Sequence, residues 1–132
     1  MTDAIAGDLK ARDRDRWLAS LYAPERARAG LVTLLALDME LGQVVATTTE
    51  PMIGQIRLAW WREALEGLDV GRVPAQPLLA AVAETLVPHD VTGAELAGLE
   101  DRWVDLIASD DVPDSHVAGG GLLFALAARL LG

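Results

Sequence analysis

Two charged side chains stand where helical periodicity places them among apolar neighbours. Asp38 lies on the crowded side of a long apolar stretch, between Leu34 and Val45, and Arg57 lies inside the apolar arc of the next predicted helix. A guanidinium and a carboxylate that are buried together form a planar, bidentate contact. We therefore expect Asp38 and Arg57 to pair. The pair would either fix the register of two antiparallel helices or line a polar patch in a ligand cavity.

Three more residues belong to the same candidate site. Glu100 is a second carboxylate on an apolar side of its predicted helix, and Trp60 and Trp61 follow Arg57 along its own helix. Either arrangement, a ligand cavity or a buried polar pair, would use these side chains. The candidate site residues are Asp38, Arg57, Glu100, Trp60 and Trp61.

Other candidates for catalysis or metal binding are weaker. His89 and His116 stand beside aspartates in predicted turns, without the spacing of metal ligands. The densest carboxylate cluster, Asp110, Asp111 and Asp114, lacks the spacing of a calcium loop, and an acidic turn that caps a helix accounts for it. The sequence has no phosphate-binding glycine loop, no nucleophile elbow and no cysteine. These patterns predict no catalytic residue, no metal ligand and no cofactor.

Composition and charge narrow the classes of function. The 132 residues fit one domain with a real core. The net charge of −9 argues against a nucleic-acid partner, which would need a basic surface, and weakens any attraction to anionic lipid. Apolar residues make up 52% of the chain, more than in an average soluble domain. The excess predicts either surface buried against a partner or lipid ligand, or an alanine-rich core.

The sequence also suggests where the protein resides. Its N-terminus lacks the basic start and apolar block of a signal peptide. The longest uncharged apolar run, residues 117–128, is shorter than the roughly 20 residues that cross a bilayer. We expect a cytoplasmic protein without a transmembrane segment, or one peripheral to the membrane.

Strong helix formers dominate the chain and predict an all-α bundle of five to six helices. Residues 1–12 read as a flexible arm, and the longest helix, at about 24–47, is apolar almost all round, as suits the centre of a bundle. Pro51 is placed to open the next helix and Gly67 to close it.

Two signals concern the second half of the chain. Thr92 is predicted to cap a helix, with Glu95 as its capping-box partner. A last helix is expected to end at Leu131. The three glycines 119–121 either lie inside that helix, where another helix crosses closely, or precede its start.

Three stretches carry a resemblance to a known family: 15–24 (DRWLASLYAP), 50–62 (EPMIGQIRLAWWR) and 102–106 (RWVDL). They resemble the squalene/phytoene synthase family, most closely a bacterial branch with an E-P-x-x-G-x-I-R-L-x-W-W-R stretch. The resemblance covers nearly the whole chain in order. It implies one domain over residues 1–132, with about half of an all-α isoprenoid-synthase fold. Active members of the family join two prenyl diphosphates head to head with Mg²⁺.

The resemblance also implies which residues catalysis would need. The first aspartate-rich motif of the family would fall at Gly42, Gln43, Val44, Val45 and Ala46, and none of these is a carboxylate. Without carboxylates, the Mg²⁺ ions that neutralise a diphosphate have no protein ligands. The second such motif belongs to the half of the fold that this chain lacks. We therefore expect a degenerate, non-catalytic binding or assembly module.

The alternative is a prenyltransferase that condenses prenyl diphosphates head to head, or a fragment of one that another chain completes; only then would Mg²⁺ be a cofactor. Half of the fold should leave two apolar faces open, one on the long helix at about 24–47 and one on the helix predicted from Pro51 to Gly67, which carries Trp60 and Trp61. We expect a homodimer, or another protein partner, to cover them. A prenyl or other lipid ligand is a further possibility.

Overall fold

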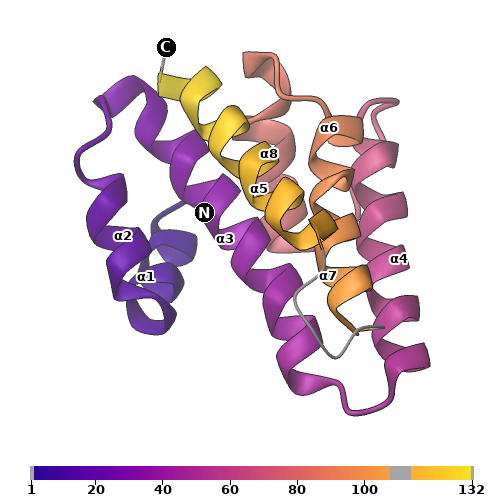
Figure 1. Cartoon of the computed structure of the whole chain (residues 1–132). Coiled ribbons are helices and arrows are strands. Elements are labelled where there is room, and N and C mark those ends of the chain that lie inside the picture. Colours follow the sequence, from indigo (N-terminus) through magenta and orange to yellow (C-terminus); the bar gives the residue numbers. More distant parts are fainter. Residues whose placement is uncertain (1, 108–113, 132) are drawn as a thin grey trace.

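The computed structural model describes residues 2–107 and 114–131, with the side chains of 4–101, 103, 104 and 121–131. In these ranges the chain is all-α, which confirms the predicted fold class (Figure 1). The helices run in chain order as α1 (Thr2–Arg12), α2 (Arg14–Ser20), α3 (Glu25–Thr47), α4 (Pro51–Leu68), α5 (Pro77–Thr85), a 3₁₀ turn η1 (Val87–His89), α6 (Gly93–Ala97), α7 (Leu99–Ile107) and α8 (Asp114–Leu131).

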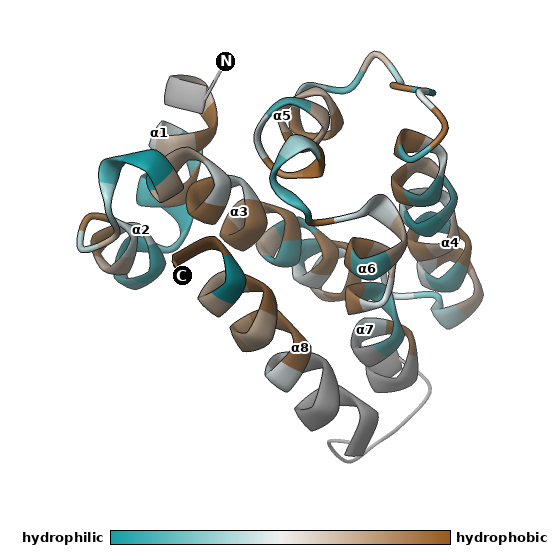
Figure 2. Cartoon of the chain, turned by 90° about the horizontal axis from the view of Figure 1, so that it is seen from above, coloured by the Kyte–Doolittle hydropathy of each residue, from teal (hydrophilic) through white to brown (hydrophobic). Residues whose placement is uncertain are grey.

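Helix α3 is the centre of the fold. It contacts α1, α2, α4, α5, α7 and α8. The view from above shows α3 running between the other helices, with much of its ribbon in the hydrophobic colour (Figure 2). Leu34, Leu37 and Leu41 of α3 are fully buried. By length and composition alone α3 could also cross a membrane. However, 56% of its most apolar 18-residue stretch is buried inside the fold. Burial of this kind is what a central core helix requires.

Helix α4 begins at Pro51, as predicted, but it does not end at Gly67. Gly67 lies inside the helix, and the residue with a left-handed backbone is Gly71, whose φ is 82°. The backbone N–H of Arg72 donates to the carbonyl of Gly67 at 3.0 Å, which closes the turn after Leu68. The chain therefore uses the second of two available glycines to leave the helix.

The flexible arm expected at residues 1–12 is instead helix α1. Leu9 is fully buried, and Ile5 contacts the core. Helix α1 contacts α2 and α3. Helices α1 and α2 lie side by side at the left of Figure 1. Ile5 and Leu9 stand four residues apart, on one side of the helix, but two large apolar residues are too few to distinguish a helix from an arm.

The second half of the chain forms more helices than expected. The single helix predicted after Thr92 is divided at Gly98 into α6 and α7. Helix α8 includes the glycines 119–121, and a Cβ added to Gly121 would meet no other atom within 4 Å. At Gly121, therefore, no close helix crossing explains the glycine. Helix α8 contacts α3 and α7 and buries Leu123 and Leu126.

Candidate functional site

Asp38 is fully buried in α3, and its ion-pair partner is Arg16 of α2. The Nη2 atom of Arg16 lies 3.2 Å from Oδ2 of Asp38. From α7, the indole N–H of Trp103 donates to Oδ1 of Asp38 at 3.2 Å. Arg16 also donates to the backbone carbonyl of Leu35 at 3.3 Å. This carboxylate therefore ties α2 and α7 to the central helix.

Asp38 and Arg57 do not form the pair that the sequence suggested. Arg57 is exposed, and its Nη1 donates to the hydroxyl of Thr48 at 2.7 Å. The reason lies in the rotation of α4, whose buried side is formed by Leu58, Trp61 and Leu65. At 100° per residue, Arg57 falls beyond the edge of that buried side and faces solvent.

Glu100 of α7 is also buried, with 5% of its surface exposed, and its partner is Arg62 of α4. The Nη1 atom of Arg62 lies 2.8 Å from Glu100 and 2.7 Å from Asp101. Hydrogen bonds to Glu100 and then to Asp101 raise the pKa of Arg62 above its ordinary value. Sequence periodicity put Arg62 on the polar side of α4, so its role was missed. In the structure Arg62 borders the buried side of α4, about 40° from Leu58 at 100° per residue, and so it can reach α7.

The two tryptophans of α4 do not line one cavity. Trp61 is buried, whereas Trp60 is 47% exposed. Their rings meet edge to face, with centroids 5.3 Å apart. Of the five candidate residues, Asp38, Glu100 and Trp61 are therefore inside the fold, and Arg57 and Trp60 are on its surface. The structure does not bring them together as one site.

One apolar surface remains uncovered, and we call it the α4 face. It consists of Met52, Ile53, Ile56 and Trp60, all exposed, with Met52 at 72% and Ile56 at 64%. These positions recur at the spacing of one side of a helix. The open face expected on α3 is absent: none of its large apolar side chains, all of them described, is exposed. Helices α5, α7 and α8 cover that side instead.

The positions that would correspond to the first aspartate-rich motif are partly built into the core. A Cβ added to Gly42 would lie 3.1 Å from the ring of Trp103, and Val44 is buried. A carboxylate at either position would have to displace Trp103 or enter an apolar core. The residues present here do not fit Mg²⁺ bound to a diphosphate, because none of them is a carboxylate.

Other metal candidates can be placed only in part. Among the residues that the structure describes, no group of three His, Asp or Glu side chains is arranged to hold a metal ion. His89 is exposed. Asp110 and Asp111 lie outside the described residues, as do the side chains of Asp114 and His116.

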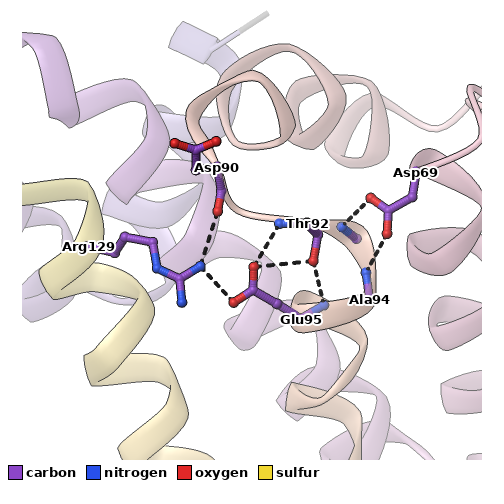
Figure 3. Close-up of polar contacts among 7 residues, drawn as sticks. Asp69, Asp90, Thr92, Ala94, Glu95 and Arg129 are labelled. Atoms are coloured by element: carbon purple, nitrogen blue, oxygen red, sulfur yellow. Dashed lines mark hydrogen bonds and ion pairs between the residues drawn. The ribbon is translucent and has the colours of Figure 1, made fainter.

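A polar cluster holds α8 against the N-terminal end of α6 (Figure 3). The Nη1 atom of Arg129 lies 2.6 Å from Glu95 and donates to the backbone carbonyl of Asp90 at 3.1 Å. Glu95 and Thr92 form the predicted capping box. The hydrogen bond from Arg129, followed by the one from the backbone N–H of Thr92, lowers the pKa of Glu95. The cluster fastens the last helix over the core.

A second contact fixes α6 to α4. The carboxylate of Asp69 accepts hydrogen bonds from the backbone N–H groups of Gly93 at 2.7 Å and Ala94 at 2.9 Å (Figure 3). The first turn of α6 thus gains acceptors for its unpaired donors. Gly93 comes so close to α4 that a Cβ there would overlap the carbonyl of Leu65. Only glycine allows this approach.

Comparison with known proteins agrees with the fold and with the α4 motif. The squalene/phytoene synthase family model matches residues 9–101. The human protein "NADH dehydrogenase (ubiquinone) complex I, assembly factor 6" is 29% identical over 71% of this chain and 28% of its own length. The rat protein of the same name is 31% identical over 64% of this chain and 25% of its own. The chain thus spans about a quarter of the length of these curated relatives.

No solved structure gives a significant match. The family model, by contrast, covers well over half of the chain, including α2, α3, α4, α5 and α6. It includes helix α4 and also residues 42–46, where the first aspartate-rich motif of the family is expected. The chain belongs to the squalene/phytoene synthase family.

Proposed function

We propose that this chain is a non-catalytic member of its family that acts as a protein-binding or assembly module. The observation that carries the proposal is the contact between Gly42 and Trp103, together with the burial of Val44. At these positions an active enzyme would need carboxylates for Mg²⁺. Here the same segment of α3 closes an apolar contact with α7.

The relatives support the same direction. The human and rat proteins are named as assembly factors for complex I, and they match 71% and 64% of this chain. A shared assembly role would need a surface that recognises protein rather than a cavity that holds two prenyl diphosphates.

The α4 face supplies such a surface. Isolated apolar side chains are common on protein surfaces, but four on one side of one helix form a contiguous patch of the kind that marks an interaction site. We propose that protein covers this patch, either a second copy of the chain, as the sequence led us to expect, or another polypeptide.

Calorimetric titration with farnesyl diphosphate and geranylgeranyl diphosphate, with and without Mg²⁺, tests the non-catalytic assignment. We expect no saturable, Mg²⁺-dependent binding. Farnesol, which lacks the diphosphate, separates recognition of the headgroup from binding of an apolar chain. Saturable binding that requires Mg²⁺ would instead favour the prenyltransferase alternative, with the missing carboxylates supplied by another chain.

Variants sharpen this test. Gly42→Asp restores one carboxylate at the first motif position, but the ring of Trp103 occupies the adjoining space. We expect Gly42→Asp to lower stability without creating diphosphate binding. The paired variant Gly42→Asp/Trp103→Ala removes that obstruction. Any Mg²⁺-dependent binding should therefore be confined to the double variant.

A further inference from the structure

The α4 face is both convex and concave. Ile53 and Ile56 protrude from the first half of the helix. Beside Trp60, in the second half, lies a hollow of about 280 Å³. Its lining residues are Trp60, Glu63, Ala64, Gly67, Arg72 and Pro74.

The protrusion and the hollow are evenly spaced about Trp60. Ile53 precedes Trp60 by seven residues, and Gly67 follows it by seven. Ile56 precedes it by four residues. Ala64, in the hollow, follows it by four. Because a helix rises about 1.5 Å per residue, an antiparallel second α4 centred on Trp60 would bring its isoleucines level with this hollow.

Charged residues flank the face instead of lying at its centre. Arg57 precedes Trp60 by three residues, and Glu63 follows it by three. At 100° per residue they stand about 60° to either side of Trp60, at opposite edges of the face. The middle of the face, where two copies would meet, is therefore apolar.

We propose that the α4 faces of two copies of this chain pair antiparallel around a two-fold axis at Trp60. Building on the proposed binding function, this inference names a second copy as the partner. The contact is isologous, since each chain offers the same protrusion and the same hollow. Val70 and Val73, both exposed in the loop after α4, extend the apolar surface toward the roughly 800 Å² per chain of a stable interface.

Sedimentation velocity over a range of chain concentrations tests the pairing. Wild type is expected to sediment as a dimer at micromolar concentration. Ile56→Glu places a carboxylate against the hollow of the second copy and should weaken dimerisation at least about tenfold. Phe124→Glu is the matched control, because Phe124 is equally apolar and 78% exposed but belongs to α8. It should leave the dimer intact, and circular dichroism verifies that both variants fold.

A cysteine away from the axis tests the orientation. Ile53→Cys places a thiol seven residues, about 10 Å along the helix, from Trp60. Two antiparallel copies would hold these thiols about 20 Å apart, too far for a disulfide, so no cross-link is expected. A parallel arrangement would cross-link residue 53 as readily as residue 60.

Cross-linking locates the axis. The chain has no cysteine, so Trp60→Cys provides one thiol per chain. Mild oxidation should then give a disulfide-linked dimer, because residues on a two-fold axis meet their own copies. Phe124→Cys, oxidised in the same way, should give no disulfide-linked dimer on a non-reducing denaturing gel.

Each result separates this inference from the proposed function. A monomeric wild type, a dimer lost in Phe124→Glu but kept in Ile56→Glu, or cross-linking at residue 124 but not 60 would overturn the pairing. None of these would restore a diphosphate site, which the titrations with Mg²⁺ measure independently. Conversely, Mg²⁺-dependent diphosphate binding by a dimer would overturn the non-catalytic assignment and leave the α4 pairing standing.

Discussion

Asp38 depends on partners that come from two other helices. Its carboxylate has no exposure to water, and Arg16 and Trp103 both donate to it. A buried carboxylate is tolerated only when such donors compensate for its lost hydration. The arginine that serves here is 22 residues away in the chain, whereas Arg57, on the adjoining helix, turns outward.

Removing this carboxylate should therefore destabilise the fold. Asp38→Ala leaves the indole N–H of Trp103 and the guanidinium of Arg16 without this acceptor, and we expect a loss of about 3 kcal/mol in the free energy of unfolding. Urea denaturation measures the loss. Glu40→Ala is the control, because Glu40 lies on the same helix, is 31% exposed and is 3.6 Å from Arg12. It should cost less than about 1 kcal/mol. Equal losses would contradict a special role for Asp38.

The Glu95–Arg129 pair should make stability depend on pH. The folded state lowers the pKa of Glu95, so the pair stabilises the protein above the ordinary glutamate value of 4.5 and ceases to do so as pH falls through the lowered value. Glu95→Gln keeps a capping-box side chain but removes the charge. It should cost about 1 kcal/mol at pH 7, with the difference from wild type shrinking below pH 4.5.

Urea denaturation at several pH values measures this difference. Glu84→Gln is a suitable control, because Glu84 is exposed and has no ion-pair partner among the described residues. Its difference from wild type should stay small at every pH. If the difference in unfolding free energy between wild type and Glu95→Gln grew toward low pH, folding would not lower the pKa of Glu95.

At the scale of elements, two helices approach closely because one residue has no side chain. Gly93 starts α6 against the carbonyl of Leu65 in α4. The carboxylate of Asp69 then receives the first N–H groups of α6. The position of α6, and with it the junction that carries Glu95, is set by this contact.

Gly93→Ala should force α4 and α6 apart. We expect a loss of about 2–4 kcal/mol, because the obstacle is backbone and cannot rotate away. Gly7→Ala is the matched control: Gly7 lies in α1, and a Cβ there would meet nothing within 4 Å. That change should raise stability by up to about 1 kcal/mol. Thermal and urea unfolding of the two variants give the comparison. A neutral Gly93→Ala would show that α6 can move without cost.

Local signals predicted two helix starts correctly. Pro51 and the Thr92–Glu95 capping box act through neighbours within one turn, and both were found where expected. Two errors had tertiary causes. The choice of Gly71 over Gly67 depends on the contact of the following loop with the helix. Helix α1 depends on burial of Leu9 against other elements, which no pattern within residues 1–12 reveals.

At the scale of the whole molecule, the sequence identified the family and the class of fold but could not assemble the site. The motif of residues 50–62 is continuous, so it can be read without knowing the fold. The partners of Asp38 and Glu100 come from helices whose rotation and order are set by packing. The open face on α4 was expected from the sequence, whereas the covered face of α3 was not, because α5, α7 and α8 pack against it.

Pairing through the α4 face would couple folding to chain concentration. If two folded chains associate and unfolded chains do not, the thermal midpoint rises with concentration. For a chain of this size a hundredfold increase should raise it by about 5 °C. Calorimetry of wild type and Phe124→Glu should show this rise, whereas Ile56→Glu should show a smaller rise that begins only at higher concentration. Because Ile56 is exposed in the single chain, its substitution should leave the fold of each chain intact. A constant midpoint for wild type would contradict the pairing.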